Sequence, residues 1–183
     1  MMNKNLFKQT NAYAMQYGLL LGVWGFLTLV LSVLAQTHVW LGWISTVLFW
    51  GSPVAGALLT LRFRAEVSEK PTAAFSFGRG FAFTFLLGLY AGVWIALGVF
   101  VYFKWFDHGY FCDLYEQVFA TGEARMQMAR QGVSETQLRE MIEQMRMMSP
   151  GVYAGTIFFL SLIADAPISL IIALIAHRSE KIA

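Results

Sequence analysis

The first third of the chain contains a run of 53 residues, from Gln9 to Leu61, without a single Asp, Glu, Lys or Arg. A water-soluble core helix does not need so long a charge-free stretch, whereas two membrane-crossing helices joined by a tight turn do. Within this run, only Gln36, Thr37 and His38 separate two apolar segments, at 12–35 and 39–61. The run therefore predicts an antiparallel pair of membrane-spanning helices.

Four apolar segments of 23 to 25 residues are long enough to cross a hydrocarbon core about 30 Å thick. Their apolar runs are continuous rather than alternating, which disfavours the strands of a membrane barrel. The first run is longer than the core of about 7–15 residues in a cleaved signal peptide, so we expect it to remain as a span. The chain is expected to be an all-α integral membrane four-helix bundle, a single membrane domain over residues 1–183, with transmembrane segments at 12–35, 39–61, 81–103 and 152–176.

The composition argues against several other classes of protein. Hydrophobic residues make up 57% of the chain and charged residues 13%, compared with about 25% charged residues in a soluble domain. A net charge of +2 provides no basic field, so no nucleic-acid partner is expected. The single cysteine, Cys112, argues against a disulfide scaffold, and the apolar composition argues against disorder. The partner that the composition implies is the lipid bilayer.

Lysine and arginine are unevenly distributed between the two sides of the predicted spans. The termini and the segment between the second and third spans carry eight Lys or Arg and three acids. Residues 104–151 carry five Lys or Arg and seven acids. Loops rich in Lys and Arg remain on the cytoplasmic side of a membrane. We therefore expect both termini to be cytoplasmic and residues 104–151 to be extracytoplasmic.

The segment between the third and fourth spans has the pattern of two amphipathic helices. Apolar residues recur at helical spacing from Phe111 to Phe119, and this helix is expected to end near Gly132. Ser134 followed by Gln137 is a capping-box signature that begins a second helix. We expect an extracytoplasmic amphipathic helical hairpin that lies on the membrane surface or caps the mouth of the bundle.

Six of the nine methionines lie between Met126 and Met148. One interpretation is capture of a soft metal ion such as Cu(I), which thioethers bind, with His108 and Cys112 nearby. The other interpretation is a pliable apolar face that contacts lipid or a partner. The helical spacing accounts for most of these methionines, so neither a metal site nor a cofactor is predicted.

Three pairs of glycines, each spaced four residues apart, are predicted at helix contacts. Small residues with this spacing let helix backbones approach closely in a membrane. Their expected role is packing within the bundle, and a homodimer seam is the alternative. The pairs are Gly18 and Gly22, Gly88 and Gly92, and Gly151 and Gly155.

The first and third spans match each other at an offset of 70 residues, with the shared motif G-L-x-x-G-V-W beginning at Gly18 and Gly88. The second and fourth spans match more weakly at an offset of 114, where Pro53 aligns with Pro167. A parallel repeat of two helix pairs is one explanation. Chance matching between apolar helices, which use few residue types, is the other.

Asp165 is the only charged residue inside the predicted spans, and it lies near the middle of the fourth. A charge at that depth costs at least about 2.5–3.5 kcal/mol, so the side chain should face the bundle interior, lose its charge or bond to a partner. Ser52 and Pro53 reach nearly the same depth in the second span. Irregular backbone at this depth is tolerated only against protein or a wet cavity.

Three tryptophans, Trp24, Trp50 and Trp94, fall at a similar depth. Tryptophan usually prefers the membrane interface, because its N–H group needs a partner. We expect some of these N–H groups to converge on Asp165 or on backbone carbonyls freed nearby. Together with Ser52, these residues form a candidate proton-coupled or polar-ligand site. The alternatives are a polar cluster that only specifies packing, and tryptophans that simply face lipid.

The sequence contains no recognisable catalytic motif. It lacks H-E-x-x-H, G-x-S-x-G, a phosphate loop and a dinucleotide fingerprint. His38, His108 and His177 lie at the ends of predicted spans and are not spaced as metal ligands. No catalytic residue is therefore predicted, and an enzyme is not the favoured interpretation.

Several short motifs resemble a known family in their order and spacing. They are A-M-Q-Y-G at Ala14–Gly18, S-F-G-R-G-F from Ser76, V-Y-F-K-W-F-D from Val101, and S-L-I-I-A-L-I-A-H-R ending at Arg178. With its four spans, the whole chain resembles the bacterial membrane proteins called domain of unknown function 4199. The resemblance implies a place in the bacterial cytoplasmic (inner) membrane and carries over no catalytic residue. Members are often encoded beside a membrane glycosyltransferase, which implies such an enzyme as a partner in a cell-envelope process.

The sequence supports two main functional hypotheses. The first is an accessory or scaffolding subunit of a lipid or glycan process in the envelope, favoured by the small-residue faces, the outer hairpin and the missing catalytic motif. The second is a small proton-coupled transporter or channel with a midplane site at Asp165. Metal or stress sensing through the outer methionines is a third and less favoured hypothesis.

Overall fold

The computed structural model describes residues 4–68 and 74–178, and these residues are almost entirely helical. Four helices are long and apolar enough to cross a membrane, which confirms the predicted all-α class and the four predicted spans. The seven helices are α1 (Lys4–Leu34), α2 (Val39–Val67), α3 (Phe77–Trp105), α4 (Tyr110–Ala120), α5 (Gly122–Arg130), α6 (Glu135–Met147) and α7 (Pro150–Ala176).

The long helices extend beyond the predicted apolar segments, because polar residues continue them at one end. α2 runs past residue 61, where Arg62 and Glu66 form an ion pair of 2.9 Å across one helical turn. α3 begins after Ser76, whose hydroxyl accepts a hydrogen bond from the backbone N–H of Arg79. Some charges that predict the orientation lie outside the described residues, namely Glu69, Lys70, Glu180 and Lys181.

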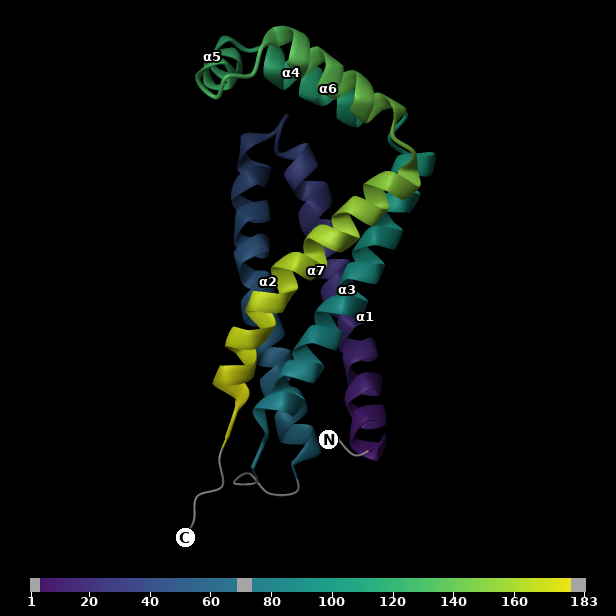
Figure 1. Cartoon of the computed structure of the whole chain (residues 1–183), viewed down its shortest axis with the longest axis vertical. Helices are drawn as coiled ribbons and strands as arrows, with labels where there is room; N and C mark the ends of the chain where they lie inside the picture. Colours follow the sequence, from purple (N-terminus) through teal and green to yellow (C-terminus); the bar gives the residue numbers. More distant parts are fainter. Residues whose placement is uncertain (1–3, 69–73, 179–183) are drawn as a thin grey trace.

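The four long helices are joined closely at one end and diverge toward the other (Figure 1). We call the end where α1 begins and α7 ends the terminal end, and the opposite end the platform end. Toward the platform end, α1 and α2 form one arm, and α3 and α7, which lie side by side, form the second arm. α1 crosses α3 and stays in contact with it as far as Phe26 and Gly98, so the divergence is mainly between α2 and α7.

Aromatic side chains close the terminal end. Phe63 of α2 is fully buried, and its ring stacks on that of Phe83 of α3 with centroids 4.1 Å apart. Phe75 meets Phe63 edge-on at 6.1 Å, and the Arg79 guanidinium lies 5.4 Å from the centre of the Phe63 ring. The backbone of Phe75 pairs with that of Arg178 through two hydrogen bonds of 3.0 Å. These contacts link α2, the start of α3 and the end of α7.

Polar contacts add to this closure. Arg64 of α2 donates a hydrogen bond of 2.9 Å to the carbonyl of Ala176 at the end of α7. The Tyr17 hydroxyl of α1 donates to the Glu66 carboxylate of α2 at 3.0 Å. The hydroxyls of Thr60 and Thr84, both buried, lie 3.2 Å apart between α2 and α3. All four long helices are therefore held together at this end.

Glycines bring α1 and α3 together where the two helices cross. A Cβ added to Gly18 would lie 2.5 Å from the Cβ of Tyr90, and one added to Gly22 would lie 2.5 Å from the Cβ of Trp94. Any larger side chain would push the helices apart. Gly151 and Gly155 are different, because no other helix in the described structure lies within 4 Å of a Cβ at either position.

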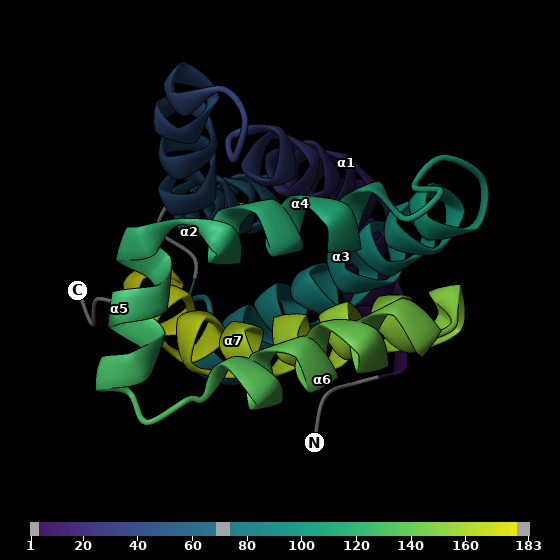
Figure 2. The same cartoon turned by 90° about the horizontal axis from the view of Figure 1, so that it is seen from above.

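α4, α5 and α6 form a platform that lies over α3 and α7, with the turn between α1 and α2 beside α4 (Figures 1 and 2). α4 and α6 run side by side, and Arg146 of α6 donates hydrogen bonds of 2.9 Å to Asp113 and Glu116 of α4. The hydrogen bond and attraction to Glu116 raise the pKa of Arg146 above its ordinary value. The guanidinium therefore remains protonated and holds the two helices together.

The predicted first helix of the platform is interrupted. Thr121 adopts an extended backbone, ends α4 and accepts a hydrogen bond from the N–H of Ala124 as the N-cap of α5. The prediction of one unbroken helix that ends near Gly132 is therefore wrong, because the helix is interrupted at Thr121. The predicted capping box is present, with Ser134 and Gln137 bonded to each other at the start of α6.

The hydrogen bonds and ring contacts that attach the platform, among the described residues, come from the α3–α7 arm. The Asp107 carboxylate after α3 accepts hydrogen bonds of 3.0 Å from the N–H groups of Gly109 and Phe111. Tyr153 of α7 donates to the carbonyl of Met145 at 2.6 Å, and its ring stacks on Phe103 of α3 at 4.0 Å. The platform is thus fixed to one arm and extends over the space beside it (Figure 2).

Candidate functional site

A cleft of about 590 Å³ lies between the two arms and is lined by residues of all four long helices. Its wall is mostly apolar, and Asp165 is its one ionisable side chain. Besides the Trp50 indole N–H, five hydroxyl groups complete the polar part of the lining. They belong to Thr28, Ser32, Ser52, Thr84 and Ser161.

The cleft has a floor toward the terminal end, where the arms meet. A Cβ added to Gly56 of α2 would lie 3.5 Å from the terminal methyl group of Ile172 on α7. At this point the hydroxyl of Thr84, which lines the cleft, lies 3.2 Å from that of the buried Thr60, and the stacked aromatic core around Phe63 lies beyond. The side chains at the terminal end therefore close the cleft from below.

Asp165 projects from α7 onto α3. Its carboxyl group lies directly over Gly88, so a Cβ at that position would overlap the Cγ and both oxygens. The Oδ2 atom is buried and forms no hydrogen bond with any residue that the structure describes. The same is true of the hydroxyl of Ser169, one turn further along α7. A buried carboxylate that lacks a partner is costly, which marks this position as a place for one.

The helix around Pro53 supplies a second polar position. Because proline lacks an N–H group, it removes a backbone donor from this part of α2. The carbonyl of Leu48, nearby in the chain, accepts hydrogen bonds from the Trp24 indole at 3.0 Å and from the Ser52 hydroxyl at 3.1 Å. One tryptophan of the predicted set therefore bonds to a carbonyl close to the proline.

The structure brings together only part of the predicted site. Asp165, Trp50 and Ser52 line the cleft, whereas Trp24 and Trp94 lie outside its lining. No hydrogen bond joins any of the three indoles to Asp165 within the part of the chain that is described. The expected convergence of indole N–H groups on this carboxylate is therefore not observed.

The sequence interpretation missed several members of the lining. Thr28, Ser32, Thr84 and Ser161 were not among the predicted site residues, and Gly88 was predicted only as a packing residue. The hydroxyl residues could have been predicted as candidates because they are scattered polar residues in otherwise apolar spans. The sequence around Gly88 does not indicate that this residue lies beneath the carboxyl group of Asp165.

A family model described as a protein of unknown function (DUF4199) matches residues 16–178. The chain belongs to the DUF4199 family. The matched region covers the whole path from within α1 to the end of α7, including every residue that lines the cleft. The resemblance seen in the short motifs is thereby confirmed. No curated protein and no solved structure matches the chain.

The platform of this DUF4199 protein contains a second hollow of about 390 Å³. Three arginines and three glutamates line it, and two of the arginines are already paired with acids. Arg146 bonds to Glu116 at 2.9 Å, and Arg125 lies 3.5 Å from Glu135. The hollow is thus balanced in charge, and its remaining ionic side chains, Arg139 and Glu143, are exposed, unlike the Oδ2 atom of Asp165.

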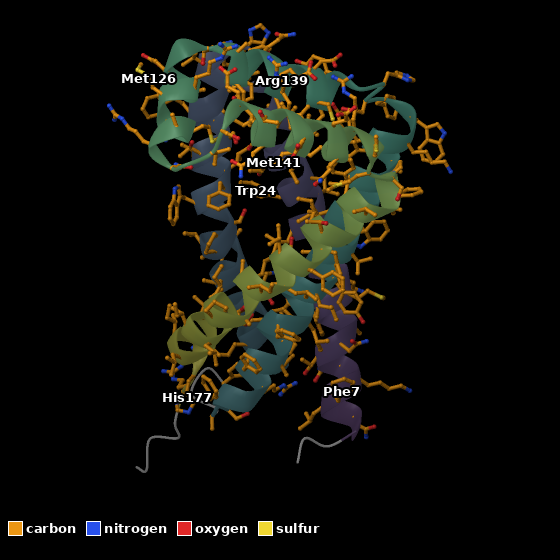
Figure 3. All side chains as sticks on the ribbon, turned by 45° about the horizontal axis from the view of Figure 1, so that its top comes forward. Phe7, Trp24, Met126, Arg139, Met141 and His177 are labelled. Atoms are coloured by element: carbon orange, nitrogen blue, oxygen red, sulfur yellow. The ribbon has the colours of Figure 1, made fainter. Side chains whose placement is uncertain are left out.

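The methionines of the DUF4199 platform divide between two environments. Met145 is half-buried, whereas Met126, Met141 and Met147 are exposed. Figure 3 shows Met126 at the far end of the platform on α5, remote from Phe7 and His177 at the terminal end. Among the described residues, no three His, Cys, Asp or Glu side chains are placed to hold a metal ion.

Proposed function

We propose that this DUF4199 protein is a small transporter or carrier that binds an amphiphilic molecule within the membrane, in the cleft between its arms. The observation that carries the proposal is the buried Asp165 Oδ2 atom, which has no described hydrogen-bond partner, in the wall of a 590 Å³ apolar cleft. Ligand pockets commonly have volumes of about 300–1,000 Å³ and apolar walls with a few polar groups. The cleft has both properties.

The shape of the cleft favours a ligand that arrives from the bilayer. The aromatic core around Phe63 and Phe83 closes the terminal end. Toward the platform end, α2 and α7 diverge (Figure 1). Trp50 of α2 lines the cleft and is 70% exposed, so the same side chain also faces the surroundings of the spans. An apolar molecule dissolved in lipid reaches such a site without crossing water.

Asp165 provides the polar contact and the position for proton exchange. No other titratable side chain of the described residues lines the cleft, so the carboxyl group is neutralised there by a proton or by the ligand. Competition between the two couples ligand movement to proton movement. This is the proton-coupled form of the transporter hypothesis.

A pair of neighbouring substitutions tests the proposal. Ala164→Trp places a large ring in the lining of the cleft, whereas Ile163→Trp places it on the adjacent, 71% exposed position outside the lining. Native mass spectrometry of protein purified in mild detergent should show a retained small molecule on the parent chain and on Ile163→Trp. Ala164→Trp should lose it. Equal retention by both variants, or no retained molecule on the parent chain, contradicts the proposal.

We also propose an accessory role for the platform, because it presents exposed methionines at a surface fixed to only one arm. The partner would be a membrane protein such as an envelope glycosyltransferase. A homodimer seam at Gly18 and Gly22 is not part of this proposal, since α3 covers both glycines. Affinity purification from native membranes should recover a stoichiometric partner that Met126→Asp and Met141→Asp together release. A parent chain that purifies alone contradicts the accessory role.

We further propose that the terminal end is cytoplasmic, the platform is extracytoplasmic and the protein lies in a bacterial inner membrane. The support is the excess of Lys and Arg at the terminal end. In a Cys112→Ser background, a membrane-impermeant maleimide applied to intact spheroplasts should label Gln131→Cys on the platform. It should leave Ala74→Cys, between α2 and α3, unlabelled. The reverse pattern contradicts the orientation.

A further inference from the structure

We infer that the cleft selects an amphiphile with a single positively charged, hydrogen-bond-donating head group, that is, a protonated long-chain amine. The inference rests on the proposed function and specifies the class of ligand that the cleft takes. It is carried by three observations: the charges around Asp165, the hydrogen-bonding state of the hydroxyls in the cleft, and the apolar character of the remaining wall.

The first observation is that no cationic side chain among residues 5–68 and 74–178 reaches the cleft. Its lining contains no Lys, Arg or His. The sequence has no Lys or Arg between Lys8 and Arg62, none between Arg79 and Lys104, and none between Arg146 and Arg178. A carboxylate in an apolar environment is stabilised by an opposite charge that also donates hydrogen bonds. Within the described residues, the ligand is therefore the available source of a paired positive charge when Asp165 is ionised.

The second observation is that the hydroxyls of the cleft can only accept further hydrogen bonds. Each of the five donates its hydrogen to a backbone carbonyl one turn earlier in its own helix, at 2.8–3.1 Å. The oxygen atoms retain lone pairs, as does the Asp165 carboxyl group. The donating residues are Thr28, Ser32, Ser52, Thr84 and Ser161.

Apart from the Trp50 indole N–H, the polar groups of the lining offer acceptors, which match an ammonium group with its three donors and no acceptor. Phosphate and carboxylate head groups have the opposite character, and their negative charge is repelled by Asp165. Trp50 contributes the one indole of the lining, and the face of an indole ring also attracts cations. The head group of an ordinary anionic lipid is therefore a poor match for this site.

The third observation is the apolar remainder of the cleft. Side chains such as Leu21, Leu29, Ile95, Ile157 and Ile168 form the wall away from Asp165. Burial of methylene groups against such a wall stabilises an alkyl chain by about the amount gained in lipid, so the chain contributes little preference between head groups. Selectivity among ligands with the same chain then comes from the head group at Asp165.

Three ligands with the same alkyl chain test this inference: dodecylamine, dodecanol and dodecanoate. Radiolabelled ligand retained by protein in nanodiscs of a zwitterionic lipid is compared with that retained by empty nanodiscs. We expect roughly tenfold greater specific retention of dodecylamine than of dodecanol, and the least retention of dodecanoate. Asp165→Asn should bring the amine-to-alcohol ratio close to one. The matched control Glu123→Gln removes an acid from the exposed surface of the platform and should leave the ratio unchanged.

The outcomes separate the inference from the proposed function. If the parent chain retains amine and alcohol equally, the selection of cations is wrong, but ligand binding in the cleft stands. If none of the three ligands is retained above the empty nanodiscs, both are wrong. A ratio that persists in Asp165→Asn also overturns the inference. Should this variant not fold, Ser161→Ala removes one acceptor and should lower amine retention several-fold without lowering alcohol retention equally.

Discussion

The carboxyl group of Asp165 on α7 lies directly over Gly88 on α3, with no room for a Cβ between them. Gly88 belongs to a pair of small residues whose spacing suggests only close approach of helix backbones. In the structure, the absence of a side chain at Gly88 also leaves the space that the Asp165 carboxyl group occupies. Helix packing and the candidate binding site therefore depend on the same position.

Gly88→Ala tests this dependence. The added Cβ overlaps the carboxyl group and forces α3 and α7 apart, so we expect a loss of about 1–3 kcal/mol in the free energy of unfolding. Gly155→Ala is the matched control, because its Cβ meets open space on the same α7. That change should be neutral or stabilising by up to about 1 kcal/mol. Thermal unfolding in one detergent measures both variants, and an equal effect would contradict the proposed contact.

Trp24→Phe should destabilise the α1–α2 arm. The substitution keeps an aromatic ring and removes the N–H group that donates to the Leu48 carbonyl at 3.0 Å. Since the Ser52 hydroxyl still bonds to the same carbonyl, the expected loss is about 0.5–1.5 kcal/mol. Chemical unfolding measures it. Trp43→Phe, at a 75% exposed position on α2, is the control and should change the stability much less.

Tyr153→Phe should loosen the attachment of the platform while leaving the spans intact. The variant loses the hydrogen bond of 2.6 Å to the Met145 carbonyl and keeps the ring that stacks on Phe103. We expect faster amide hydrogen exchange in α6 and unchanged exchange in α1 and α2. Tyr110→Phe, which alters an exposed tyrosine at the start of α4, should show the exchange pattern of the parent chain. No difference between the two variants would contradict this role of Tyr153.

Arg146→Gln should separate α4 from α6, because one guanidinium bonds to both Asp113 and Glu116. Faster amide exchange in both helices is the expected result, and Arg130→Gln is the control on the same platform. The raised pKa of Arg146 determines how the stability of the link between α4 and α6 changes with pH. Its contribution is complete below the unfolded pKa and is lost only as the pH rises through the higher folded value. The link should therefore not weaken between about pH 6 and pH 10.

The four spans and the family could be predicted because both depend on local pattern. A charge-free run of apolar residues has few alternatives to a membrane helix, whatever the rest of the chain does. The ends of the helices were harder to predict, since they depend on single polar contacts. The ion pair of Arg62 and Glu66 continues α2, and the backbone of Thr121 interrupts the platform.

Asp165 could be identified as a candidate from its charge alone, but the cleft beside it could not. The walls of the cleft come from four helices, whose relative placement is set by contacts between distant parts of the sequence. The stack of Phe63 on Phe83 and the backbone pairing of Phe75 with Arg178 are two such contacts. The Trp24 bond shows the same limit, because the expectation of a carbonyl partner near Pro53 did not specify which carbonyl.

The one-sided attachment of the platform has a mechanical consequence. Tyr153 and Asp107 join it to the α3–α7 arm, while the aromatic core at the terminal end keeps the two arms from separating there. α1 and α3 also remain in contact as far as Phe26 and Gly98, so the parts free to move apart are α2 and α7, which pivot about the core of Phe63 and Phe83. A ligand that parted the arms beside Asp165 would swing the far end of the platform, where Met126 lies, through a larger displacement. Ligand binding in the cleft, within the membrane, would then change the position of the platform surface outside the membrane.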